Sequence, residues 1–397
     1  MFQNSNKMAG IYIHIPFCRS RCIYCAFYST TDLRWRQRYV DAVCREWQLR
    51  SHELSTPATT VYFGGGTPSQ LTPQQLQQLL TALPPSAPEA TIEANPDDIT
   101  PTYAATLSQL GIKRVSMGAQ TFDDQRLHFL HRRHTSGQVK EAVHHLRNAG
   151  IRNISIDLMY GFPGETLSDL ERDINAALAL DVEHISAYCL TVEKGTPLFY
   201  QMRNEKLEMR NGNEEMRKCG GDKDSSLFTL HSSLPSEELE RAMYERLIDK
   251  LEAAGYEHYE ISNFAKPGFR SRHNSSYWQD IPYIGLGAAA HSYDGRCRSW
   301  NISDIRQYME AMERGERLFE SETLDDDTHY NDRITVALRT REGLDLTTLS
   351  PKHHRYCLKE AQRFIDDGEL RIDGDHLSLT RKGLFISDYI MSSLIYI

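Results

Sequence analysis

Three cysteines near the amino terminus carry the clearest chemical signal of the sequence. Cys18, Cys22 and Cys25 follow the spacing C-x3-C-x2-C. Three thiolates within eight residues suit a cubane iron–sulfur cluster that keeps its fourth iron open, since cysteine is the usual protein ligand of such clusters. A zinc site would need a further C-x2-C or H-x3-H pair, and the sequence has none. Nothing in the sequence indicates the oxidising compartment that disulfides require.

The cysteines follow a short predicted strand. Ile11, Ile13 and Ile15 alternate with other residues, which is the pattern of a buried strand, and Pro16 ends it because proline has no N–H to donate. The cysteines therefore belong to the loop at the carboxyl end of this strand. In β/α folds that end of the strands carries the chemistry.

Further strands and helices alternate from this point to residue 191. About six strand–helix units can be counted, which predicts a parallel sheet in an α/β fold with fewer units than the ~8 of a closed barrel. Several strands end in residues suited to a binding site. The run Gly64 to Gly66 lets backbone approach a ligand, Glu93 ends one strand and Gln120 another. Asp157 lies within an apolar strand, where a charge is costly unless it faces a pocket.

A second motif lies far from the cysteines in the sequence. His273 is followed by Tyr277 and Trp278 in the stretch HNSSYW. A histidine can present a ring nitrogen to a metal, haem iron commonly takes an axial histidine, and the two aromatic side chains can form a flat wall against a macrocycle. The alternative interpretation is a structural histidine whose ring nitrogens bond within the protein.

The remaining pattern divides the chain. Residues 1–200 hold the strand–helix units and the cysteine loop, 201–235 form a polar insertion, 236–320 complete the barrel and contain HNSSYW, and 321–397 read as helix, helix, hairpin and helix. The last segment is predicted to be a small winged-helix-like α+β domain. Its 10 Lys and Arg against 14 Asp and Glu make it a poor phosphate binder, so a lid or a protein-docking surface is expected.

Composition limits the class of protein. The 397 residues are 40% hydrophobic and 25% charged, as in ordinary globular proteins, and the net charge of −9 argues against nucleic acid as a partner. No apolar run reaches the ~20 residues of a transmembrane helix, and the first residues lack the apolar region of a signal peptide. A cytoplasmic protein is expected, because eight cysteines without regular pairing fit a reducing compartment.

The motifs IHIPFC…C…YCAF and HNSSYW resemble the radical-SAM proteins, and within them the branch of oxygen-independent coproporphyrinogen III dehydrogenases and HemW-type haem chaperones. The resemblance covers nearly the whole chain. It implies an open (β/α)6 partial barrel of TIM type, a [4Fe-4S] cluster on Cys18, Cys22 and Cys25, and S-adenosyl-L-methionine on the open iron. It also implies haem, with His273 as its ligand. The residues that match the family's adenosylmethionine contacts are Tyr12, Tyr24, Gly65, Gly66, Thr67, Glu93, Gln120, Arg132 and Asp157.

Three features favour the haem chaperones over the dehydrogenases. The enzymes carry a fourth cysteine two residues after the third, where this chain has Phe27. The enzymes also have a long amino-terminal arm before the cluster, whereas only 17 residues precede Cys18 here. Finally, the enzymes lack the HNxxYW motif that this chain contains. A chaperone would hand haem to haem-requiring client proteins, including membrane-associated ones. The dehydrogenases instead decarboxylate propionate side chains by radical chemistry in haem biosynthesis. A monomer and a homodimer are both compatible with the sequence.

Overall fold

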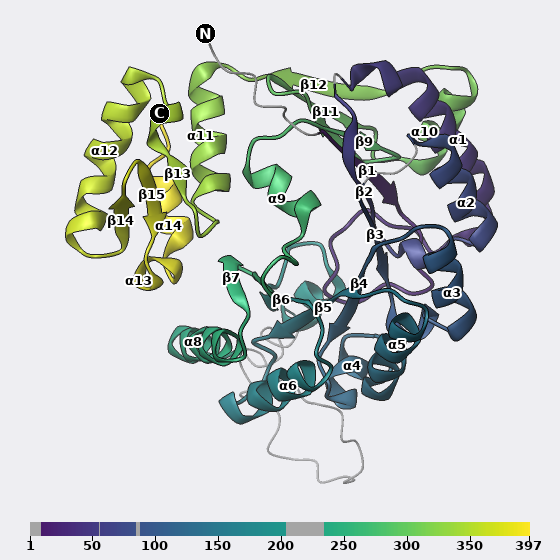
Figure 1. The fold of residues 1–397 in the computed structure, drawn as a ribbon, viewed down its shortest axis with the longest axis horizontal. Helices are drawn as coiled ribbons and strands as arrows, with labels where there is room; N and C mark the ends of the chain where they lie inside the picture. The colour runs from purple at the N-terminus through teal and green to yellow at the C-terminus, as the bar shows by residue number, and fades with distance from the viewer. Residues whose placement is uncertain (1–8, 55, 85–87, 204–233) are drawn as a thin grey trace, which may run out of the picture.

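The computed structural model describes residues 9–54, 56–84, 88–203 and 234–397. A twelve-stranded sheet forms a large domain and a three-stranded sheet forms a small one. Figure 1 shows helices along the outer side of the large curved sheet, while α9 (Arg272–Trp278) lies on its inner side. Most of the predicted polar insertion, residues 204–233, lies outside the described residues.

Six strands run parallel in the order of the sequence and form the centre of the large sheet. They are β1 (Ala9–Ile15), β2 (Ala58–Gly65), β3 (Glu89–Ala94), β4 (Arg114–Gln120), β5 (Asn153–Tyr160) and β6 (His184–Cys189). The helices α1 (Arg36–Arg50), α2 (Pro73–Ala82), α3 (Pro101–Gln109) and α6 (Leu167–Ala179) follow β1, β2, β3 and β5, while α4 (Asp124–Phe129) and α5 (Ser136–Asn148) both follow β4 and α8 (Glu237–Ala253) comes after β6. The predicted six β/α units are therefore confirmed.

Shorter strands extend this sheet on both sides. Beyond β1 lie β9 (Tyr283–Leu286), which pairs with it in parallel, and then the antiparallel strands β10 (His291–Tyr293), β11 (Cys297–Asn301) and β12 (Phe319–Thr323). Beyond β6 lie β8 (Asn263–Ala265) and β7 (Glu257–Glu260), after the helix α8 (Glu237–Ala253). The sheet order ends in β12 on one side and β7 on the other, so the barrel is open, as predicted.

The alternation of side chains in the strands divides the protein into an apolar shell and a polar interior. Ile11, Ile13 and Ile15 are fully buried in the main core with side chains of α1 and α2. The residues between them in β1 point to the other face of the sheet, where the ring of Tyr12 stacks on Tyr62 of β2. Polar side chains of the strands therefore share the inside of the barrel.

The helices begin where the sequence supplies caps. Thr72, Thr135 and Thr166 each accept a hydrogen bond from a backbone N–H in the first turn of α2, α5 and α6. A Gln or Asp three residues later closes a capping box at each site. These caps fix where each helix departs from the carboxyl end of the preceding strand, which is the end that carries the candidate site.

The small domain has its own core and antiparallel sheet. Its elements are α11 (Asp326–Ala337), β13 (Leu344–Asp345), α12 (Pro351–Asp366), β14 (Leu370–Asp373), β15 (His376–Leu379), α13 (Arg381–Leu384) and α14 (Ser387–Ser393). The hairpin predicted in this segment is confirmed by the pairing of β14 with β15, in which Asp373 lies opposite His376. The expected boundary at residue 320 falls inside β12, which pairs with β11, so the large sheet continues to Thr323.

Candidate functional site

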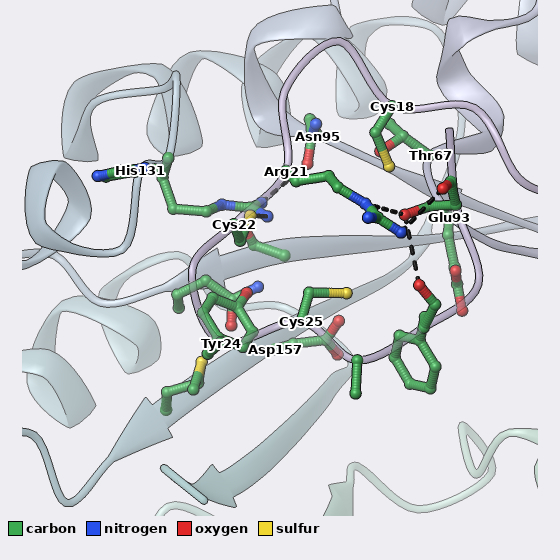
Figure 2. A pocket seen from close by; sticks show the side chains of 18 of the residues that line it. Cys18, Arg21, Cys22, Tyr24, Cys25, Thr67, Glu93, Asn95, His131 and Asp157 are labelled. Carbon is green, nitrogen blue, oxygen red and sulfur yellow. Dashed lines mark hydrogen bonds between the residues drawn. The ribbon is translucent and has the colours of Figure 1, made fainter. Parts of the chain in front are cut away.

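The cysteine loop follows β1, and two backbone hydrogen bonds join its two ends. Thr30 donates its backbone N–H to the carbonyl of Pro16 at 2.6 Å and accepts from the N–H of Cys18 at 2.9 Å. Within the loop, Arg21 donates to the hydroxyl of Ser29 at 3.1 Å and to its carbonyl at 2.9 Å (Figure 2). The three cysteines are free thiols, with Cys18 buried and Cys22 and Cys25 half-buried.

This loop covers a cavity of about 720 Å³ at the carboxyl ends of β2 to β6. Figure 2 shows Cys18, Cys22 and Cys25 around it, together with the carboxylates of Glu93 and Asp157. Eleven of the thirteen residues predicted from the sequence line this one cavity. They are Cys18, Cys22, Tyr24, Cys25, Gly65, Gly66, Thr67, Glu93, Gln120, Arg132 and Asp157.

The glycine run serves the cysteine loop as well as the cavity. A Cβ on Gly66 would lie 2.9 Å from the carbonyl carbon of Pro16 and 3.1 Å from the Sγ of Cys18, while Gly65 has a φ of +111° that disfavours other residues. The next residue, Thr67, places its hydroxyl 3.5 Å from the same Sγ. Side chains larger than hydrogen would therefore push the loop off the end of β2.

Glu93 ends β3 with both carboxylate oxygens bonded. Tyr62 donates its hydroxyl to Oε1 at 2.8 Å, and Gly65 donates its backbone N–H to Oε2 at 3.0 Å. Burial raises the pKa of Glu93 to about 7, and the charge of Asp157 adds to the rise. Burial also raises the pKa of Asp157, against hydrogen bonds from Ser186 and Ser116 that lower it. The cavity thus holds two carboxylates whose ionisation is sensitive to their surroundings.

Arg132 reaches the cysteine loop from the segment after α4. Its guanidinium donates to Asn95 Oδ1 at 2.8 Å and to the carbonyl of Gly118 at 2.7 Å, and another nitrogen lies 3.4 Å from the Sγ of Cys22. Its neighbour Arg133 forms ion pairs with two aspartates at 2.9 Å and 3.2 Å instead. Arg132 is therefore the arginine that brings a positive charge to a cysteine sulfur.

Asn95 and Gly118 belong to the site although neither was singled out from the sequence. A Cβ on Gly118 would lie 2.5 Å from the amide nitrogen of Gln120 and 2.8 Å from the guanidinium of Arg132, so only glycine leaves room for both side chains. Asn95 lies two residues after Glu93, and Gly118 two residues before Gln120. This period-two spacing from predicted site residues was the available signal, because alternate residues of a strand share a face.

The thiols and the tyrosine of the loop are shifted toward their neutral forms. Burial raises the pKa of Cys18 and of Cys25, although Thr67 and the backbone of Phe27 oppose it. Burial also raises the pKa of Tyr24, whose ring packs against the small apolar cluster of Ile23 and Leu130. Metal or cluster binding by the cysteines must therefore release protons, because the thiolate is the form that ligates.

Tyr12 and His273 lie outside this cavity. The ring of Tyr12 lies beside the rings of Tyr62 and His273, at centroid distances of 6.2 Å and 6.4 Å, and those two rings stack on each other at 5.0 Å. Its hydroxyl lies 3.1 Å from Nδ1 of His14. Tyr12 thus packs inside the barrel below the cavity, and its adenosylmethionine contact stays a prediction.

His273 lies on α9, which was not predicted as a helix. The ring is 1% exposed, with Nδ1 at 2.8 Å from the hydroxyl of Thr60 and Nε2 at 2.8 Å from the hydroxyl of Tyr277. Its backbone N–H donates to Glu89 at 3.3 Å. Burial, followed by the charge of Arg114, lowers the pKa of His273 to about 3. Both ring nitrogens of this neutral histidine are therefore engaged within the protein, as the structural interpretation expected, and iron ligation stays a prediction.

The two sites predicted from the sequence lie at opposite ends of the same strands. Thr60 and Glu89 lie in the first half of β2 and β3 and bond to α9, whereas Gly65 and Glu93 lie at the carboxyl ends of those strands and line the cavity. A second cleft of about 280 Å³ adjoins α9, bordered by Trp278 and by side chains of α11 in the small domain. Among the described residues, no group of three or more His, Cys, Asp or Glu side chains could hold a single metal ion.

Comparisons with known proteins agree with this arrangement. The model of the radical SAM superfamily matches residues 12–177, and the model of the HemN C-terminal domain matches residues 324–386. The solved structure of coproporphyrinogen III oxidase (HemN) from Escherichia coli has a TM-score of 0.78 at 21% identity, covering 98% of this chain and 90% of that one. Fold and site together define a radical-SAM protein with a HemN-type carboxyl-terminal domain.

Curated relatives narrow this class. The heme chaperone HemW of Bacillus subtilis is 36% identical over 88% of this chain and 88% of its own length. The heme chaperone HemW of Mycobacterium tuberculosis is 33% identical over 97% of this chain and 94% of its own length. The chain therefore belongs to the HemW family of radical-SAM proteins.

Proposed function

We propose that this protein is a haem chaperone. It would hold a [4Fe-4S] cluster on Cys18, Cys22 and Cys25, bind S-adenosyl-L-methionine in the adjoining cavity, and carry haem at α9 for delivery to haem-requiring proteins. The relatives named heme chaperone support this proposal. The observation that carries it is the buried, neutral His273 of α9, whose ring is held by Thr60 away from the cysteine loop, while Trp278 of the same helix lines a separate cleft.

The donors around the cavity fit the cluster and the cofactor. Three free thiols lie at its edge, and Arg132 and Thr67 approach two of the sulfurs with groups that can stabilise negative charge there. The Nε of Arg132 is buried without a hydrogen-bond partner among the described residues, so the site can still take an acceptor. Once bound, a cluster and adenosylmethionine supply one-electron chemistry. The chain's own part is to bind them, orient them and exclude water.

Glu93 and Asp157 would hold the polar groups of adenosylmethionine. Its amino group is a cation and its ribose carries hydroxyl donors, which are the partners that carboxylates accept from. Gly65 and Gly66 let the ligand approach the backbone, and Gln120 adds an amide. Tyr12 would support this site indirectly, because its ring packs on the ring of Tyr62 and the hydroxyl of Tyr62 donates to Glu93.

His273 would bind the haem iron through Nε2 after the hydroxyl of Tyr277 moves away. A neutral imidazole is the form that ligates a metal, and its lowered pKa keeps it neutral throughout the physiological range. Thr60 would accept a hydrogen bond from Nδ1–H and so fix the ring and its tautomer. The spacing of His273 and Tyr277 explains part of the HNxxYW motif, because residues four apart meet on one helix face.

The cysteines also bear on the cellular compartment of the protein. We place it in the cytoplasm, because all seven cysteines among the described residues are free thiols and a reducing compartment maintains them. No helix in the described part of the chain has the length and apolar character to cross a membrane. The clients would be haem-requiring apoproteins, and the acidic small domain is the surface proposed for docking them.

The alternative is an oxygen-independent coproporphyrinogen III dehydrogenase. Where those enzymes carry a fourth cysteine, this chain places Phe27, 69% exposed at the edge of the cavity. The deciding experiment incubates the reconstituted protein anaerobically with coproporphyrinogen, reductant and adenosylmethionine. In parallel, haem-loaded protein is mixed with a haem-requiring apoprotein. We expect haem transfer without porphyrinogen turnover. Protoporphyrinogen formed over many turnovers would contradict the proposal.

A further inference from the structure

The turn between β9 and β10 contains a strained residue that hydrogen bonds hold in place. Gly287 and Ala289 have positive φ angles of +100° and +62°, and an alanine rarely adopts this conformation. The backbone N–H of Gly287 donates to Glu46 at 2.8 Å, and that of Ala289 donates to the carbonyl of Ile302 at 3.1 Å. Strain of this kind persists only where the surroundings determine it, and it clusters at functional sites. The turn leads directly into His291, the first residue of β10.

His291 is an exposed histidine whose ring has a fixed neighbour. It lies opposite Trp300 of β11, and the two rings stack at a centroid distance of 5.8 Å and an angle of 26°. The indole N–H of Trp300 donates to Glu320 of β12 at 3.2 Å, which holds the indole against the imidazole. Neither ring nitrogen of His291 has a hydrogen-bond partner among the described residues. His291 therefore presents an oriented imidazole that can accept a ligand without first breaking a hydrogen bond.

A row of aromatic rings connects His291 with α9. Tyr293 lies two residues after His291 on the same face of β10, directly opposite Tyr283 of β9. Tyr283 meets the ring of Tyr277 edge-on at 4.6 Å, and Tyr277 meets the ring of His273 edge-on at 5.1 Å. Because α9 lies on the inner side of the sheet, these side chains of β9 and β10 share that side (Figure 1). The exposed and the closed histidine thus lie at the two ends of one aromatic row.

A single open imidazole suits one class of metal ligand. In the part of the chain that the structure describes, no group of three or more His, Cys, Asp or Glu side chains could hold a metal ion, so His291 lacks companions for a bare ion. A haem needs none, because its macrocycle fills four positions of the iron and leaves an axial position for one histidine. Its flat apolar rings also pack well on aromatic side chains. The chemistry that fits His291 is therefore an iron tetrapyrrole.

We propose that His291 is a receiving ligand for haem, which binds the iron first and passes it along the aromatic row to His273. In this transfer the bond from iron to His291 breaks and a bond to Nε2 of His273 forms. No electron or proton is transferred, because a neutral imidazole is the ligand in both states. The hydroxyl of Tyr277 leaves Nε2 before the second bond forms. The inference rests on the proposed function for haem as the cargo, and it adds a site that binds haem while α9 is still closed.

Stopped-flow mixing of haem with the original protein and its variants provides the test. We expect a fast phase in the Soret region that depends on haem concentration, followed by a slower phase that does not. His291→Ala should slow the fast phase by about tenfold or more, since even a partner of a metal ligand is worth about that factor in affinity. Its equilibrium affinity should change much less, because His273 remains. His273→Ala should keep the fast phase and lose the slow one.

Three controls separate iron ligation from packing. His291→Met offers a thioether, which also binds haem iron, and should recover part of the fast phase. His376→Ala removes an exposed histidine of β15 in the small domain and should change neither phase. Iron-free protoporphyrin, followed by its fluorescence, should bind the original protein and His291→Ala at the same rate.

An unchanged fast phase in His291→Ala would overturn the inference. Equal slowing of haem and of iron-free protoporphyrin would also overturn it, because His291 would then only stack on the macrocycle. If His291→Ala does not fold, His291→Gln takes its place, with the same slowing of haem alone expected and the same two results decisive. Failure of the original protein to bind haem at all would contradict the proposed function, whereas unchanged rates contradict only the role of His291.

Discussion

The same strands form both ends of the barrel, but the candidate site is an open cavity at one end and a closed histidine site at the other. At the carboxyl ends, the chain leaves a cavity of about 720 Å³ edged by free thiols and carboxylates. At the amino ends, α9 closes the barrel, and both ring nitrogens of His273 are bonded to side chains. One end is ready to receive ligands, whereas the other must first release a hydrogen bond. The comparison teaches that a motif can be chemically suited to a ligand and still be closed in the resting protein.

The largest expected effect separates the two ends completely. Replacing Cys18, Cys22 and Cys25 with alanine removes every proposed protein ligand of the cluster, so the visible iron–sulfur absorbance of reconstituted protein should vanish. Haem binding at α9 should remain. Cys44→Ala is the control, because Cys44 lies on α1 away from the cavity. A triple variant that keeps a full cluster would refute the ligand assignment.

The corresponding experiment at the amino ends of the strands replaces His273. His273→Ala should lower haem affinity by tenfold or more and weaken the Soret band, because the proposed axial ligand is gone. The iron–sulfur absorbance should not change, since the cavity lies at the other end of the strands. Exposed His52, replaced with alanine, serves as the control. An unchanged Soret band in His273→Ala would move the iron ligand elsewhere.

The glycine run gives a steric test of the open end. Gly66→Ala places a Cβ 2.9 Å from the backbone of Pro16, so we expect a loss of about 1–3 kcal/mol in the free energy of unfolding and poorer cluster incorporation. Gly137→Ala is the matched control, because its Cβ would meet only Thr135 Oγ1 at 3.7 Å within α5. Chemical denaturation measures both. Equal stabilities would mean that the loop does not need this glycine.

Thr60 tests whether the closed end is built to present an iron ligand. Thr60→Val removes the hydrogen bond to Nδ1 while keeping the shape, and should lower haem affinity roughly tenfold, as for other partners of metal ligands. Thr60→Ser keeps the hydroxyl and should restore binding. Haem titrations of the two variants provide the comparison. If valine and serine behave alike, Thr60 has only a packing role.

The smallest expected effect is an increase in haem affinity rather than a loss. Tyr277→Phe removes the hydroxyl that occupies Nε2 of His273, so haem should bind about fivefold more tightly, equivalent to about one net hydrogen bond. Stopped-flow mixing should also show faster association. Weaker binding in Tyr277→Phe would mean that this hydroxyl stabilises the haem-bound state rather than the closed one.

The sequence was most informative where a motif is local. The cysteine spacing, the glycine run and the strand ends at Glu93 and Gln120 predicted one end of the barrel, because parallel strands bring their carboxyl ends together. The other end depends on pairings that no local pattern encodes. α9 has only seven residues, too few for a helical period, and the bonds of His273 to Thr60 and of Arg272 to Glu89 join segments more than 180 residues apart.

The distance between haem iron and the cluster tests the two-ended arrangement most directly. Both centres can be made paramagnetic, so pulsed electron paramagnetic resonance on protein loaded with haem and cluster can measure it. The strand length from Thr60 to Gly65, with the loop beyond it, predicts a separation on the order of 20 Å. A separation below roughly 10 Å would place haem over the cysteine loop and contradict the account.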